Sequence, residues 1–126
     1  MKCSKEIKSY RDLIVWQKAH ELAKLVLGFT KEQFPNSDEA KIIKRQVIRP
    51  VLSVPANIAE GYGGHKGAVY RNHLLIARGS LLESDYWLFL SLDIGFLSQT
   101  DFNGAISLLN EVRALLSAII DKLAAN

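Results

Sequence analysis

The sequence predicts an all-α protein folded as an antiparallel, up-down-up-down four-helix bundle. Apolar residues recur at the three- and four-residue spacing of amphipathic helices over four long segments. Short turn signals separate these segments, and no alternating polar and apolar run is long enough to compete for a sheet. Connections this short join antiparallel neighbours. We therefore expect one bundle domain over residues 10–126, preceded by a flexible segment at residues 1–9.

The first helix is predicted over residues 10–33. Ser9 and Asp12 have the three-residue spacing of a capping box, in which each side chain bonds the other's backbone amide. Pro35 ends this helix, because proline disfavours the helical conformation in the residue before it. Ser37 can cap the helix that follows. One face of the first helix carries apolar residues at the expected spacing: Leu13, Trp16, Ala19, Ala23 and Val26.

The second helix is predicted over residues 38–60, and two prolines lie inside it. Pro50 and Pro55 lack the amide that bonds four residues back, so we expect a kink there. Four glycines at residues 61–67 predict a turn that ends the helix, since glycine loses the most backbone entropy on becoming helical. His65 lies in this turn, where mobility favours contact with an outside molecule.

A polar stripe on the second helix borders its apolar face. The stripe could be a ligand or interface site, with Arg49 as a nearby cation, or a structural hydrogen-bond network that compensates the prolines. We favour the structural network, because buried polar groups are usually satisfied by one another. Its members are Gln46, Ser53, Asn57 and Glu60.

The third helix, predicted over residues 68–93, is apolar nearly all round in its second half. A helix of a monomeric small bundle should have one polar face exposed to solvent, so the excess of apolar residues predicts burial against another subunit. Gly79 and Ser80 are expected to permit close approach of a neighbouring helix. After a turn, Thr100 is expected to cap the fourth helix. The expected oligomer interface contains Tyr86, Trp87, Phe89 and Leu90.

Composition and motifs indicate a non-enzymatic cytoplasmic protein without cofactor or metal. The three histidines have no glutamate three residues before them, as a di-iron bundle requires, and the single Cys3 forms no metal site or internal disulfide. The glycine run does not match a phosphate-binding loop. No secretion signal and no run of about 18 apolar residues is present, so no membrane partner is expected.

Positive charge is concentrated in the first part of the chain. Residues 1–49 hold 11 Lys and Arg against 6 Asp and Glu, whereas residues 50–126 hold 5 against 7. This bias predicts a phosphate-binding patch at one end of the bundle, although acidic residues lie in the same region. The alternative is an oligomeric protein-binding scaffold that ignores nucleic acid. The candidate RNA-binding residues are Lys31, Lys41, Lys44, Arg45 and Arg49.

Several segments resemble one family over most of the chain. The most specific is SVPANIAEG at residues 53–61. LIVWQKA at 13–19, Phe-Pro at 34–35, ARGSLLE at 77–83 and LDIGFL at 92–97 are also similar. The family is that of bacterial four-helix bundle proteins encoded by intervening sequences in 23S ribosomal RNA genes.

This resemblance implies a homopentameric four-helix bundle. Such a bundle is similar also to the accessory protein of diversity-generating retroelements, which associates with nucleic acid and a reverse transcriptase. Relatives commonly read Gln-x-Arg-Arg-Ala-Ala where this chain has QVIRPV at residues 46–51, so Ile48 replaces an arginine and Pro50 an alanine. One charge that the family carries is therefore missing here.

Overall fold

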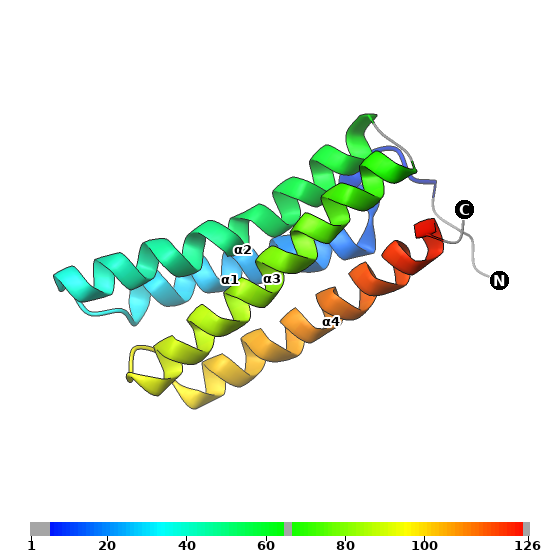
Figure 1. Cartoon of the computed structure of the whole chain (residues 1–126). Coiled ribbons are helices and arrows are strands. Elements are labelled where there is room, and N and C mark those ends of the chain that lie inside the picture. Colours follow the sequence, from blue (N-terminus) through cyan, green and yellow to red (C-terminus); the bar gives the residue numbers. More distant parts are fainter. Residues whose placement is uncertain (1–5, 65–66, 125–126) are drawn as a thin grey trace.

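Four long α-helices make up most of the protein, and the computed structural model describes residues 6–64 and 67–124. This confirms the predicted all-α four-helix bundle, and the described ranges contain no strand. Figure 1 shows each helix running back along the one before it. The helices are α1 Ile14–Glu32, α2 Asp38–Gly64, α3 Ala68–Asp93 and α4 Gln99–Ala124, preceded by the short 3₁₀ helix η1 Tyr10–Asp12.

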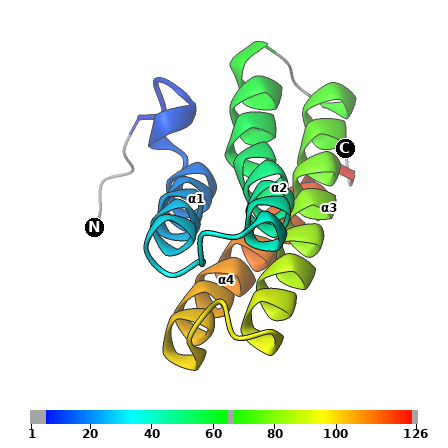
Figure 2. The ribbon, with the colours of Figure 1, turned by 90° about the vertical axis from the view of Figure 1, so that its left-hand side faces the viewer.

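The four helices surround one apolar core. Figure 2 shows α1 and α3 on opposite sides of the bundle, with α2 and α4 between them. Each helix turns a stripe of fully buried aliphatic side chains inward, and burying one such side chain stabilises a fold by about 1.5–3 kcal/mol. The stripes include Leu22 and Val26 of α1, Val51 and Ile58 of α2, Leu74 and Leu81 of α3, and Leu109 and Leu116 of α4.

The first helix begins later than the sequence predicted. The expected capping box is present, with the Ser9 amide donating to Asp12 Oδ2 over 3.2 Å, but it closes only the 3₁₀ turn η1. Leu13 is extended (φ −76°, ψ 128°), so α1 starts at Ile14. Of the predicted flexible segment 1–9, residues 1–5 lie outside the described residues.

The second helix continues past its predicted end, through Gly64 rather than stopping at residue 60. Gly61 is buried against α3, where a Cβ atom on it would lie 2.6 Å from His73 Cβ and 3.2 Å from Tyr70 Cδ1. Packing against α3 offsets the entropy that glycine loses in a helix. Predictions made for residues 65 and 66, His65 included, lie outside the described residues.

Both prolines are accommodated inside α2 without ending the helix. Pro50 and Pro55 are buried on the side of α2 that faces the other helices. The kink expected at these residues stays a prediction. Among the helices of residues 6–64 and 67–124, none combines the length and hydropathy needed to cross a membrane.

Serine side chains cap α2 and α4. Ser37 Oγ accepts a hydrogen bond from the Ala40 amide at 3.1 Å, as the sequence predicted. Ser98, not Thr100, caps α4, because the helix begins at Gln99, two residues earlier than a cap at Thr100 predicts, and Ser98 Oγ accepts from the Asp101 amide at 3.2 Å. Gln33 links the end of α1 to the start of α4, since its Nε2 donates a hydrogen bond to Asp101 Oδ2 at 2.6 Å.

Candidate nucleic-acid interface

Five cationic side chains gather where the end of α1 meets the first half of α2. We call them the basic patch: Lys31, Lys41, Lys44, Arg45 and Arg49. They border two adjoining hollows, and the structure thus brings together all five residues that the sequence singled out. The larger hollow, about 450 Å³, is lined by Lys41, Lys44, Arg45, Ile48 and Arg49. The smaller, about 230 Å³, is lined by Thr30, Lys31, Phe34, Pro35, Asn36, Ala40, Lys41 and Lys44.

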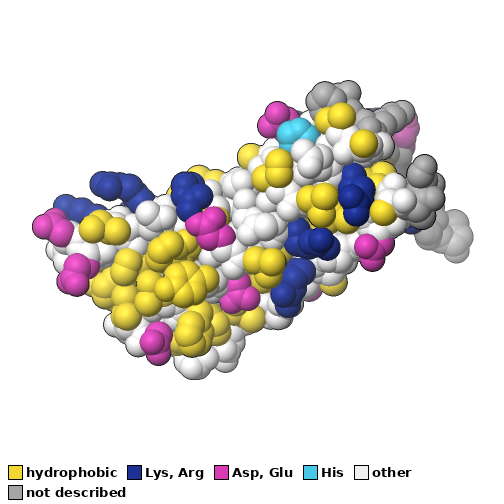
Figure 3. Space-filling view, viewed as in Figure 1, with side chains coloured by type: hydrophobic (Ala, Val, Ile, Leu, Met, Phe, Trp, Pro, Cys, Tyr) yellow, Lys and Arg dark blue, Asp and Glu magenta, His cyan; other side chains and the backbone are white. Residues whose placement is uncertain are grey.

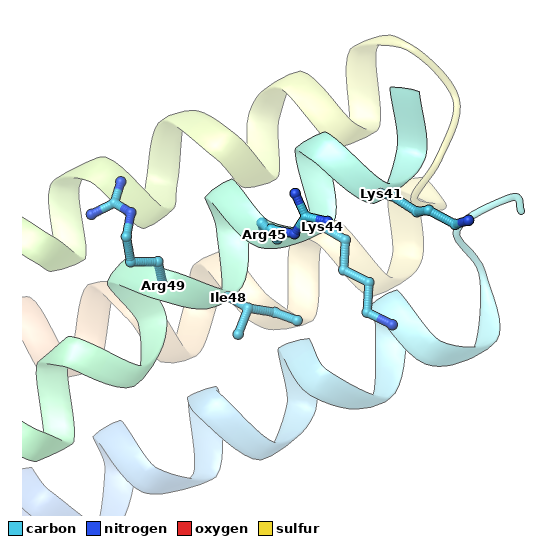
Figure 4. A pocket seen from close by; sticks show the side chains of 5 residues that line it. All are labelled: Lys41, Lys44, Arg45, Ile48 and Arg49. Carbon is cyan, nitrogen blue, oxygen red and sulfur yellow. The ribbon is translucent and has the colours of Figure 1, made fainter. Parts of the chain in front are cut away.

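Helical spacing explains why the larger hollow forms. Residues three and four apart share one face of a helix, so residues 41, 44, 45, 48 and 49 of α2 are neighbours on its surface. Figure 4 shows Lys44 and Ile48 pointing toward α1, and Arg49 pointing toward α3. Ile48 is half-buried and packs on the core beneath, which places an apolar side chain among four cations.

Arg49 differs from the other four cations because it is paired. Its Nη2 atom forms a salt bridge with Glu83 Oε2 of α3. The same carboxylate oxygen accepts a hydrogen bond from Trp87 Nε1 at 3.1 Å. The Trp87 indole and the Arg49 guanidinium together hold the pKa of Glu83 below its usual value. Much of the positive charge of Arg49 is therefore balanced within the bundle.

The remaining cations of the basic patch have no such partner. In the described part of the chain the ion pairs are Lys18–Glu111, at 3.3 Å, and Arg49–Glu83. The acidic residues expected to oppose the patch, Glu32, Asp38 and Glu39, are all exposed and belong to neither pair. Lys31, Lys41, Lys44 and Arg45 therefore carry charge that an outside anion can neutralise.

The predicted polar network forms in part and includes residues of α3. Asn57 Nδ2 donates to Ser53 Oγ and to the Ser53 carbonyl, both at 3.0 Å. Asn57 Oδ1 lies 3.1 Å from His73 Nδ1, and Ser80 Oγ donates to Ser53 Oγ at 3.0 Å. These bonds join α2 to α3, so the network fixes how the two helices align.

Two predicted members lie outside this network. Gln46 Oε1 accepts a long 3.4 Å hydrogen bond from Arg49, and Glu60 is exposed. Pro50 and Pro55 leave the carbonyls of Gln46 and Val51 without their usual helical donors. The Asn57 side-chain amide donates to the Ser53 carbonyl and not to either of these, so it does not compensate the prolines as expected. Sequence reasoning missed His73. The indication of its role is spatial: His73 lies opposite Gly61, where α3 contacts α2.

The predicted oligomer interface on α3 divides into exposed and half-buried residues. Tyr86 and Phe89 are 55% and 52% exposed, whereas Trp87 and Leu90 are half-buried. Figure 3 shows a broad hydrophobic area over the end of α3 and the adjacent start of α2. We call the exposed large hydrophobic residues from the middle of α3 to its exit the apolar face: Ile76, Leu82, Tyr86, Phe89 and Ile94.

Gly79 lies within this exposed surface and does not mediate close packing inside the bundle. A Cβ atom on Gly79 would meet no atom within 4 Å, so the expectation that it permits approach of a neighbouring helix within the chain is wrong. Gly61 has that role instead. Ser80, beside Gly79, contributes a hydrogen bond to Ser53. Within residues 6–64 and 67–124, no three His, Cys, Asp or Glu side chains are grouped so as to hold a metal ion.

Comparison with known proteins places this bundle in a family. The family model described as 23S rRNA-intervening sequence protein matches residues 11–118, which include parts of all four helices. The chain belongs to this family. The resemblance seen in the sequence is thereby confirmed.

A solved structure shows the same fold. It is the crystal structure of a protein with unknown function from the S23 ribosomal protein family, from Bacteroides thetaiotaomicron VPI-5482. The two chains superpose with a TM-score of 0.78 and 26% sequence identity, over 85% of this chain and 98% of the other. No curated protein sequence matches the chain.

Proposed function

We propose that this family member is a non-catalytic, cytoplasmic, oligomeric bundle that associates with RNA through the basic patch. The observation that carries the proposal is the gathering of four cations outside the ion pairs, together with the paired Arg49, around two adjoining hollows. Lysine and arginine side chains neutralise phosphates and release the counterions condensed on the nucleic acid. Binding of this kind weakens as salt rises and depends little on base sequence.

Oligomerisation is supported by the apolar face of α3. Soluble monomers rarely expose large contiguous hydrophobic patches, and such patches mark interaction sites. Tyr86 and Phe89 are more than half exposed, and aromatic residues are enriched in subunit interfaces. A homo-oligomer, pentameric as the family resemblance implies, would repeat the basic patch once per subunit. Several weak phosphate-binding surfaces on one particle raise the overall affinity.

A second candidate function is an oligomeric protein-binding scaffold without RNA binding. The observation that favours it is apolar surface beyond the apolar face, since Ile42 and Leu52 of α2 are 56% and 43% exposed. If oligomerisation covers only α3, such residues remain available to another protein. The two functions differ in their response to polyanions, because only the RNA-binding function requires the basic patch.

The test is size-exclusion chromatography with light scattering, with and without cellular RNA, at low and moderate salt. We expect an oligomer that gains RNA mass at low salt and loses it at moderate salt. The triple variant Lys41→Glu, Lys44→Glu, Arg45→Glu should abolish this gain and still assemble. The control reverses two exposed cations of α4, Arg113 and Lys122, which lie far along the chain from the patch. Unchanged RNA binding by the triple variant would refute the proposal and favour the scaffold.

A further inference from the structure

The larger hollow of the basic patch combines an apolar floor with a charged rim. Half-buried Ile48 forms the floor, and Lys41, Lys44, Arg45 and Arg49 line the same hollow, with Ile48 on the side toward α1 and Arg49 on the side toward α3 (Figure 4). Lysine and arginine carry their charge at the end of aliphatic stems, so the walls of the hollow are apolar near Ile48 and cationic at the edge. A surface that only neutralised phosphates would need no apolar floor.

Arg49 adds a fixed planar group to this hollow. Its Nη2 atom contacts both Glu83 Oε2 and Gln46 Oε1, the latter at 3.4 Å, so one nitrogen of the guanidinium is held by two acceptors. The Glu83 carboxylate is itself held by Trp87 Nε1 at 3.1 Å. A guanidinium whose charge is already balanced contributes little to phosphate binding, but its plane is a surface on which a nucleobase can stack.

The form of the nucleic acid follows from this chemistry. In a duplex the flat faces of the bases are stacked inside, and a protein surface meets phosphates, sugars and base edges. An unpaired nucleotide can turn its base out of the strand and place the apolar face of that base in a pocket. The larger hollow, about 450 Å³, offers apolar volume beside phosphate-binding cations.

We propose that the hollow above Ile48 receives an unpaired base of single-stranded RNA, with the base stacked against Arg49. Lys41, Lys44 and Arg45 neutralise the phosphates on either side of that base. This inference rests on the proposed RNA binding and specifies the form of RNA that is bound. It requires no base-specific hydrogen bond, so the preference is for unpaired strands rather than for one sequence.

The test measures fluorescence anisotropy of a labelled RNA strand, alone and annealed to its complement, with the full-length protein at two salt concentrations. Base stacking on a protein side chain is worth about 1–3 kcal/mol, and about 1.4 kcal/mol is tenfold in affinity. We therefore expect the single strand to bind roughly fivefold or more tightly than the duplex. The preference should persist at the higher salt, because stacking is less screened than phosphate binding.

Two substitutions that each add one positive charge distinguish base binding in the hollow from a general electrostatic effect on RNA affinity. Ile48→Lys fills the floor with a cation that has no stacking plane, whereas Leu52→Lys adds the same charge to an exposed position one turn away that lines neither hollow. Both variants should bind duplex RNA more tightly than the parent. Only Ile48→Lys should lose the single-strand preference.

A third substitution tests the stacking plane without changing net charge. Arg49→Lys keeps a cation that can pair with Glu83 but removes the guanidinium plane. We expect severalfold weaker binding to the single strand and unchanged binding to the duplex. Thermal unfolding followed by circular dichroism checks that each variant is folded, and Arg49→Lys is decisive if Ile48→Lys unfolds the bundle.

The outcomes distinguish the two proposals. Equal affinity of the parent for single-stranded and duplex RNA would overturn the proposed base-binding role of the hollow while leaving RNA binding intact. So would changes of the same size in the single-strand and duplex affinities of all three variants. Absence of binding to either RNA at low salt would overturn both. A single-strand preference that is lost in Ile48→Lys and reduced in Arg49→Lys but kept in Leu52→Lys supports the inference.

Discussion

Gly61 of α2 lies so close to His73 of α3 that a Cβ atom on Gly61 would be 2.6 Å from His73 Cβ. His73 Cβ is fixed to its own helix, so no rotation of a side chain can relieve this contact. The approach explains why a glycine belongs at this position. It also places the Asn57 side chain, one turn earlier on α2, within 3.1 Å of the His73 ring.

We expect Gly61→Ala to destabilise the fold even though alanine is the better helix former. Alanine gains about 1 kcal/mol of helix propensity over glycine. Forcing an extra carbon into a packed contact costs about 1–3 kcal/mol, and here it must move two helices apart. Urea unfolding followed by circular dichroism at a fixed protein concentration measures the difference.

The matched control is Gly79→Ala on α3. Because a Cβ at Gly79 meets nothing within 4 Å, we expect this variant to be more stable than the parent by about 0.5–1 kcal/mol. If Gly61→Ala also proves more stable than the parent, the close approach of α2 and α3 at His73 is not a constraint. Weakened assembly of Gly79→Ala would instead place Gly79 in a contact between copies.

Asn57→Ala should cost about 1–3 kcal/mol of stability. The change removes the hydrogen bonds from Asn57 to Ser53 and between Asn57 and His73, in a partly buried network that joins α2 to α3. Asn103→Ala is the control, because Asn103 is exposed and bonds only locally, to Gln99 at 2.9 Å. Equal stability of the two variants would show that the network contributes no more than a surface hydrogen bond.

How far the sequence predicts this fold depends on whether a feature is local. Helical periodicity and the caps at Ser9 and Ser37 are local, and the predicted bounds of α3 agree with the structure. The end of α2 could not be predicted the same way. Glycine propensity favours a turn at Gly61, but contact with His73, twelve residues further along the chain, keeps the residue helical.

The candidate site shows the same limit. Helical spacing along α2 and the short connection to α1 were enough to predict that Lys31, Lys41, Lys44 and Arg45 lie near one another. The state of Arg49 was not predictable, because its partner Glu83 is 34 residues away on another helix. Local charge counting therefore overstates the cationic charge of the patch.

The Arg49–Glu83 pair gives stability a dependence on pH. Hydrogen bonds from Trp87 and Arg49 lower the pKa of Glu83 in the folded protein, and unfolding removes both donors. The pair therefore stabilises the fold above the ordinary glutamate pKa of 4.5, and the contribution is lost as pH falls through the lower, folded value. Because solvent screens this exposed pair, we expect the effect to be small.

Glu83→Gln tests this dependence while keeping the shape of the side chain. The difference in unfolding free energy between parent and Glu83→Gln should be largest near neutral pH and should vanish in acid. Trp87→Phe, which removes one donor to Glu83 and keeps an aromatic ring, should reduce the pH dependence of the parent without abolishing it. A difference that stays constant from neutral to acid pH would contradict the assignment.

Assembly through α3 is tested by placing charge on the most exposed part of the apolar face. Tyr86→Lys combined with Phe89→Lys should yield smaller particles by light scattering, because two buried charges without partners are costly in an interface. The bundle should remain folded, since both side chains are more than half exposed in the single chain. Ile14→Lys is the control: Ile14 is 59% exposed but lies on α1, away from the apolar face. If the α3 variant assembles like the parent while Ile14→Lys does not, the subunits meet through α1 and the apolar face is left for another protein.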